Sequence, residues 1–208
     1  LSYSLFNPKI LPEHRMWDRW KDNELRYWFN IPAVVLANKI LYPEHTMVLY
    51  VSKNIWDHDL CRVLEILNHQ LNRFSVQTID MEYQTTEPAI WRMMPMWRRD
   101  VEIFHTRDID SMPTEAEYKY TKAFEKSKYS IGTLRTHQNH YGVKCRMLAG
   151  LSSFKPEKIP MYIKGPGFQE YYAKKHNWYG SDQDLMIKTF TEDKVFTANN
   201  FFDGNHGE

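Results

Sequence analysis

The segment at residues 47–51 constrains the fold more than any other part of this 208-residue chain. It reads Met-Val-Leu-Tyr-Val and lacks the polar–apolar alternation of a strand that has one face in water. A continuous apolar run of this kind is typical of a strand covered on both faces, as in parallel sheets wrapped by helices. The segment therefore predicts a buried central strand in an α/β protein.

Strand-like and helix-like segments alternate along the rest of the chain. Apolar runs bounded by turn-forming residues predict strands at residues 3–6, 75–80, 101–104, 129–134 and 145–151. Helical spacing, caps and prolines predict helices at residues 30–42, 60–71, 90–97, 114–126 and 182–190, and Thr114 with Glu117 forms a capping-box pattern. This alternation is typical of a mostly parallel central sheet flanked by helices. No shift in composition marks a boundary, so we expect one Rossmann-like domain over residues 1–208.

Composition and charge exclude several classes of protein. The chain has 27 Lys and Arg against 26 Asp and Glu, a net charge of +1, whereas nucleic-acid-binding domains are usually clearly basic. Mean hydropathy is −0.63, and no apolar run approaches the ~20 residues of a membrane-spanning helix. The first residues lack the basic flank of a signal peptide, and two cysteines are too few for a disulfide framework. We expect a cytoplasmic protein that binds no nucleic acid and spans no membrane.

Two aspartates follow the strand predicted at residues 101–104. Asp108 and Asp110 are two residues apart, so in an extended segment their carboxylates point the same way. Parallel α/β sheets bind ligands beyond the carboxyl ends of their strands, which is where this pair is expected. Oxygen ligands of this kind suit Mn²⁺ or Mg²⁺. The alternative is a solvated turn in which an aspartate caps the next helix.

Two later segments carry further polar groups. Asp182, Gln183 and Asp184 stand at the start of a predicted helix and offer the mixed donors and acceptors that sugar hydroxyls require. The alternative is a simple helix cap, which accounts for one carboxylate. Near the end, His206 is followed by a glycine and would be a neutral imidazole ligand for a metal, unless the tail is a disordered terminus.

Taken in order, these residues resemble the motifs of GT-A-fold glycosyltransferases of the retaining type, such as glycogenin and bacterial galactosyltransferases. Asp108-x-Asp110 is similar to the DxD motif of that family, and residues 148–150 (Leu-Ala-Gly) to its small-residue segment beside the sugar pocket. The Asp-Gln-Asp at residues 182–184 and the His206-Gly207 pair also match. The chain more faintly resembles the sugar-transfer domain of algal-virus capsid glycosyltransferases, which would place it in the host cytoplasm.

The resemblance implies a role for each matching residue. Asp108, Asp110 and His206 would bind Mn²⁺ or Mg²⁺ on the donor diphosphate, and Asp182 and Gln183 would be the catalytic residues facing the donor sugar. The remaining contacts to the nucleotide sugar would come from Phe6, Asn7, Arg92, Arg107, Ala149, Gly150 and Asp184. The family's lysine after the metal-binding histidine is missing, and Arg92 or Lys164 would take its place.

The resemblance implies a metal-dependent hexosyltransferase that moves a sugar from a UDP-sugar to a glycan or protein acceptor with retention of configuration. Two alternatives remain open. A nucleotidyltransferase would also use two carboxylates, but it usually needs a glycine-rich phosphate loop near the first strand, and residues 4–7 contain no glycine. A carbohydrate-binding module without catalytic activity would use some of the 31 aromatic residues.

Overall fold

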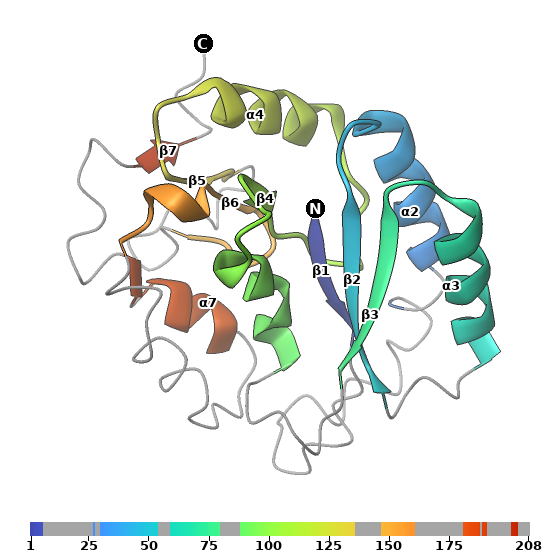
Figure 1. The fold of residues 1–208 in the computed structure, drawn as a ribbon. Helices are drawn as coiled ribbons and strands as arrows, with labels where there is room; N and C mark the ends of the chain where they lie inside the picture. The colour runs from blue at the N-terminus through green and yellow to red at the C-terminus, as the bar shows by residue number, and fades with distance from the viewer. Residues whose placement is uncertain are drawn as a thin grey trace.

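The computed structural model is an α/β structure with two sheets (Figure 1). It describes residues 1–5, 27, 30–53, 59–79, 88–135, 147–160, 181–187, 189–190 and 201–203. The first sheet is parallel, with the order β1-β2-β3. Its strands are β1 (Ser2–Leu5), β2 (Met47–Ser52) and β3 (Phe74–Ile79), joined by the helices α2 (Asn30–Leu41) and α3 (Asp59–Gln70).

Both faces of the parallel sheet are covered. Met47, Leu49 and Val51 of β2 point into the cluster that α2 and α3 complete, with Val34 and Leu64 among its buried members. The intervening strand residues face the other way, where Tyr50 and Ile79 pack against Trp91. Trp91 belongs to η3 (Pro88–Trp97), a 3₁₀ helix that contains Pro95. The continuous apolar run of β2 is therefore explained by a helical layer on each side.

The second sheet is mixed and has the order β4-β6-β5-β7. It consists of β4 (Phe104–His105), β5 (Ile131–Thr133), β6 (Ser152–Phe154) and β7 (Phe201–Asp203). The β4·β6 and β5·β6 pairs are antiparallel, and β5·β7 is parallel. The helix α4 (Glu115–Lys126) contributes Tyr120 and Phe124 to one core cluster of this half, and α7 (Ser181–Ile187) contributes Met186 to the other. A 3₁₀ turn, η6 (Pro156–Lys158), follows β6.

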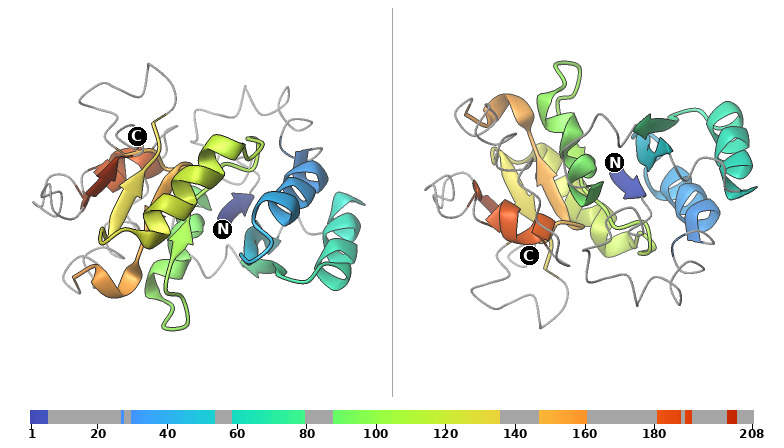
Figure 2. Two further views of the ribbon diagram at one scale, coloured as in Figure 1. Left: turned by 90° about the horizontal axis from the view of Figure 1, so that it is seen from above. Right: turned by 90° about the horizontal axis from the view of Figure 1, so that it is seen from below.

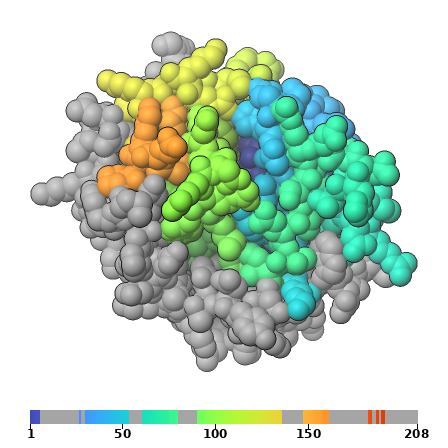
Figure 3. Space-filling view, viewed as in Figure 1, coloured from blue at the N-terminus to red at the C-terminus, as the bar shows by residue number. Residues whose placement is uncertain are grey.

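The helix η3 lies between the two sheets. Its Trp91 packs on the parallel sheet, while Met93 and Met96 pack on the mixed sheet. Figure 3 shows this green segment filling the space between the orange and the blue-to-teal parts of the chain. The sheets also meet directly, because Thr106 forms a parallel bridge with Ser2 of β1. Figure 2 shows α2 and α3 on one side of the parallel sheet and the second sheet on the other.

The expected α/β class is confirmed, and most of the predicted elements form within a few residues of their expected bounds. The capping box of α4 is present, since Thr114 and Glu117 each bind the other's backbone nitrogen. Among the described residues no helix is long and apolar enough to cross a membrane.

Three expectations need correction. The second sheet is largely antiparallel, whereas the sequence indicated a mostly parallel arrangement throughout. The strand expected at residues 101–104 shrinks to Phe104 and His105, because only these two residues pair with β6. In the strand expected at residues 145–151, the described part, residues 147–151, is a turn, and pairing begins at Ser152. The Leu148 carbonyl accepts hydrogen bonds from Leu151 and the Ser152 hydroxyl, which closes this turn.

Candidate functional site

The side chain of Arg92 joins two segments that are far apart in the sequence. Its Nη1 forms an ion pair with Oδ1 of Asp108, and its Nη2 lies 3.1 Å from Oδ2 of Asp182. The side chains of Arg92 and Asp182 are 11% and 12% exposed, whereas that of Asp108 is 45% exposed. We call Arg92, Asp108, Asp110 and Asp182 the carboxyl-edge cluster. One buried guanidinium thus connects the two aspartate motifs that the sequence singled out.

Hydrogen bonds to the main chain position Arg92, Asp182 and the segment that leads to Asp108. The Ser2 hydroxyl donates to the Arg92 carbonyl at 2.6 Å, which ties η3 to β1. The amide of Arg107 donates to the Ser2 carbonyl at 3.0 Å, so the chain leaves the sheet junction toward the carboxyl end of β1 and reaches Asp108. Asp182 begins α7, where its Oδ1 accepts from the amide of Gln183 at 2.9 Å. These contacts hold Arg92 and Asp108 beside β1, and the parallel bridge between Ser2 and Thr106 runs the segment that carries Asp108 in the same direction as that strand.

Gly150 has no side chain, and this leaves the space that the Asp108 carboxylate occupies. A methyl group built on Gly150 would lie 2.6 Å from Oδ1 of Asp108 and still closer to Oδ2 and Cγ. Only a residue without a Cβ permits this approach. Ala149 precedes it and is buried in the core of the mixed sheet. The small residues at this turn therefore shape the site by leaving space for a carboxylate.

The carboxylates around Arg92 stabilise its positive charge. Burial alone would lower the pKa of Arg92, but the charges of Asp108 and Asp182, the hydrogen bond that Arg92 donates to Asp108 and the charge of Asp110 raise it overall. Arg92 is therefore permanently charged. The charge of Asp110 also acts on Arg92, but residues 109–110 form a turn, so Asp108 and Asp110 do not lie in the extended segment expected from the sequence.

The other residues expected at the site are distributed differently. Arg107 is buried and points away, because its Nη2 donates to the Thr121 hydroxyl of α4 at 3.0 Å. Gln183 is half-buried at the start of α7. Four further expectations concern positions or side chains outside the described part of the structure: Phe6, Asn7, Asp184 and His206. Lys164, named as a substitute cation, also lies outside it.

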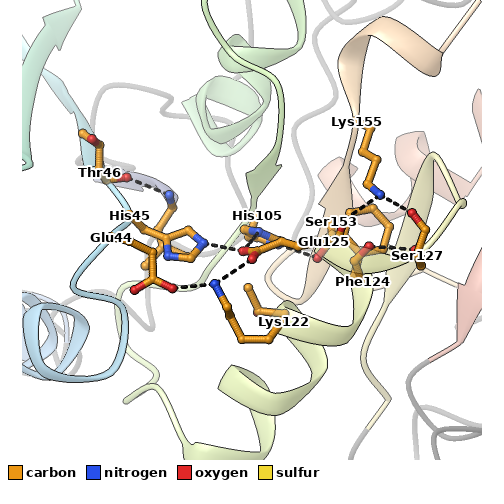
Figure 4. Close-up of polar contacts among 12 residues, drawn as sticks. Glu44, His45, Thr46, His105, Lys122, Phe124, Glu125, Ser127, Ser153 and Lys155 are labelled. Atoms are coloured by element: carbon orange, nitrogen blue, oxygen red, sulfur yellow. Dashed lines mark hydrogen bonds and ion pairs between the residues drawn. The ribbon is translucent and has the colours of Figure 1, made fainter.

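A second polar cluster was not foreseen from the sequence. His45, His105 and Glu125 bring one potential ligand atom each to within 4.8 Å of one another (Figure 4). These residues lie 60 and 20 positions apart, so no local spacing marks them as a group. The available signal was His105 itself, a polar residue directly after the strand predicted at residues 101–104. His45 immediately precedes the start of β2, so this cluster lies near the amino ends of the parallel strands.

Comparisons with known proteins identify no family. No protein-family model matches the chain, and no curated protein matches it. Among solved structures, it is similar to the crystal structure of 4-diphosphocytidyl-2C-methyl-D-erythritol synthase from Anaerococcus prevotii. The two are 10% identical with a TM-score of 0.49, over 84% of this chain and 75% of that one. A likeness at this level carries no argument about activity.

Proposed function

We propose that the carboxyl-edge cluster binds a nucleotide sugar with a divalent cation and transfers the sugar to an acceptor. The observation that supports this proposal is the placement of Arg92 between Asp108 and Asp182. In the glycosyltransferases that the sequence resembles, the corresponding two motifs would bind the diphosphate and the sugar of one donor. Here the same two motifs, 74 positions apart, meet at a single buried cation.

Asp108 and Asp110 offer the type of donor that a hard divalent cation takes, although among the described residues the aspartates of this cluster do not bring three potential ligand atoms within 4.8 Å of one another. Asp108 keeps almost half of its side chain exposed, and the charge of Asp110 reaches the same guanidinium. Carboxylate oxygens are the ligands that Mn²⁺ and Mg²⁺ take in proteins. When bound there, such an ion would neutralise charge that develops on a leaving diphosphate.

The chain's own residues then have distinct tasks. Arg92 would donate charge-assisted hydrogen bonds to phosphate oxygens, because its planar guanidinium offers several donors in fixed directions. Asp182 is held by Arg92 and by the amide of Gln183, so its carboxylate is oriented to accept from a sugar hydroxyl or to stabilise positive charge at the anomeric carbon. Asp108 is positioned by Arg92 on one side and Gly150 on the other.

Nucleotidyl transfer is the second candidate function. Two neighbouring aspartates and a guanidinium suit attack on a phosphorus atom as well as attack on an anomeric carbon, because both reactions need charge compensation on a phosphate leaving group. The two reactions differ in products. Sugar transfer or donor hydrolysis releases a nucleoside diphosphate, whereas nucleotidyl transfer releases pyrophosphate from a nucleoside triphosphate.

The experiment uses the wild-type chain with Asp110→Asn and, as a control on an exposed helix residue, Glu115→Gln. Calorimetry with a panel of UDP-sugars, with Mn²⁺ or with EDTA, measures donor affinity, and product analysis separates diphosphate from pyrophosphate release. We expect metal-dependent donor binding that Asp110→Asn weakens and Glu115→Gln leaves unchanged. Equal binding in all three proteins with EDTA would refute the proposal and favour a binding module. Pyrophosphate release from a nucleoside triphosphate would replace sugar transfer by the second candidate.

A further inference from the structure

His45, His105 and Glu125 come from three elements that meet near the amino ends of the parallel strands. His45 lies in the turn between α2 and β2, His105 is in β4, and Glu125 is in the last turn of α4. Nε2 of His45 is 2.5 Å from Oε1 of Glu125, and Nε2 of His105 is 3.5 Å from the same oxygen. Figure 4 shows both imidazoles directed at this carboxylate.

The second imidazole is incompletely satisfied. The side chain of His105 is 1% exposed, and its Nε2 has no hydrogen-bond partner. Its other nitrogen, Nδ1, is 2.7 Å from the Ser153 hydroxyl, which fixes the ring so that Nε2 faces Glu125. Nδ1 of His45 is also buried without a hydrogen-bond partner. Buried polar atoms are rarely left without partners, so a group that is aimed into a cluster in this way indicates a ligand.

The contacts around the Glu125 carboxylate leave one of its oxygens for the two imidazoles. Lys122 binds Oε2 of Glu125 at 2.8 Å and Glu44 at 2.5 Å. Oε1 therefore remains directed at the two imidazoles.

We propose that His45, His105 and Glu125 form a binding site for a divalent transition-metal ion of the zinc type. Two imidazoles and one carboxylate are a common donor set for Zn²⁺, whereas Mg²⁺ prefers oxygen ligands alone. In a tetrahedral zinc site neighbouring ligand atoms are roughly 3.3 Å apart, given zinc–ligand bonds of roughly 2.0–2.2 Å. The separations of 2.5 and 3.5 Å lie on either side of that value, and all three ligand atoms lie within 4.8 Å of one another, so the side chains would have to shift to accept an ion.

The surroundings supply the other parts of such a site. Ser153 orients His105, and Lys122 orients Glu125, as partners outside the coordination sphere do in metal centres. His45 also lines a cavity of about 320 Å³ beside α2 and the amino ends of the strands. The cavity thus reaches one of the three proposed ligands, and its other lining residues include Asn38, Tyr42, Met47, Arg73 and Phe74.

The site is separate from the carboxyl-edge cluster and does not depend on the proposed function. Its three residues belong to the α2–β2 turn, β4 and α4, so a bound ion would connect both halves of the fold. We therefore assign it a structural role, in which metal binding raises the stability of the folded chain.

The test is calorimetric titration of the EDTA-treated, buffer-exchanged chain with ZnCl₂, together with melting curves and the visible spectrum after Co²⁺ substitution. We expect one ion per chain, a higher Tm with Zn²⁺, no effect of Mg²⁺, and the intense absorption of tetrahedral Co²⁺. His45→Ala and Glu125→Gln should weaken Zn²⁺ binding by about 100-fold or more, since even outer-shell partners are worth about 10–100-fold.

Two matched controls locate the bound ion. Glu44→Gln removes a carboxylate that contacts Lys122 but is not a ligand, and His69→Ala removes an exposed imidazole of α3. Both should bind Zn²⁺ like the wild type. Asp110→Asn tests whether the ion occupies the carboxyl-edge cluster, and it should also leave Zn²⁺ affinity unchanged. Absence of saturable binding to the folded wild type would overturn the proposal, as would equal affinity in folded Glu125→Gln. Circular dichroism establishes that each variant is folded.

Discussion

The most informative single change at the carboxyl-edge cluster is Gly150→Ala. The added methyl group would overlap the Asp108 carboxylate, which is 2.6 Å away at Oδ1 and nearer at its other atoms. Gly150 does not adopt a left-handed backbone conformation, so alanine brings no backbone strain. The substitution therefore perturbs the site through one contact and leaves the Asp108 side chain chemically intact.

We expect Gly150→Ala to change the free energy of unfolding only slightly but to reduce the rate of sugar transfer strongly. Asp108 is 45% exposed, so its carboxylate can swing toward water, and losing a half-exposed ion pair costs at most about 1 kcal/mol. Replacing glycine with alanine recovers about 0.4–1 kcal/mol by restricting the unfolded chain. The net change in the free energy of unfolding should be within about 1 kcal/mol of zero, or about 2–4 °C in Tm. The carboxylate must nevertheless move by roughly 1 Å, and misplacement of that size can reduce the rate of transfer about 100-fold.

The assay measures Tm and the rate of UDP-sugar turnover on the same preparations. The control is Gly132→Ala, in which a methyl group would meet the Tyr120 hydroxyl at 2.6 Å and Cδ2 of Phe124 at 2.7 Å. Both rings are buried in the core, so this variant should lose about 1–3 kcal/mol of stability and retain its turnover while folded. Undiminished turnover in Gly150→Ala would refute the role given to Asp108. A large drop in its Tm would instead show that Gly150 is needed for folding.

Three further changes test the packing around the two sites. Arg92→Met removes the cation shared by two carboxylates, one of them the nearly buried Asp182, and should cost about 3–5 kcal/mol by chemical denaturation as well as abolish donor binding. Lys155→Met removes hydrogen bonds from its ammonium to two carbonyls at the end of α4, and should lower the unfolding free energy by about 1–3 kcal/mol. Thr114→Ala breaks the capping box with Glu117 and should cost about 1 kcal/mol, whereas a change of zero would show that α4 needs no cap.

The elements that the sequence predicts well are those whose residues specify them locally. The run at residues 47–51 is apolar because both of its faces are covered, and Thr114 with Glu117 encodes the start of α4 in four residues. The mixed sheet is different. The strands β4, β5 and β6 have two or three residues each, and their pairing is set by contacts between distant segments. Such short strands have too few residues for a period-2 pattern to be recognised.

The two clusters differ in the same way. Asp108 and Asp110 form a local pattern after a strand, so the sequence indicates a ligand site there, and the meeting of Asp108 and Asp182 at Arg92 is consistent with that interpretation. The position of Arg107 was not predictable, because its direction depends on the packing of α4 and Thr121. The cluster of His45, His105 and Glu125 was equally inaccessible, because its members meet only after three elements have packed.

The segment from His105 to Asp108 links the two clusters, because His105 belongs to one of them and Asp108 to the other. Thr106 bonds to the main chain of Ser152 and pairs with Ser2, so this segment is the seam between the two sheets and is held from both sides. The His105 side chain points toward Glu125 of α4, and the Asp108 side chain points toward Arg92 of η3. Three extended residues span roughly 10 Å, which is enough to separate two polar clusters by buried main chain. The backbone of this segment is hydrogen-bonded to both sheets, so its N–H and C=O groups need no further partners. The segment can therefore position a polar side chain at each of its ends.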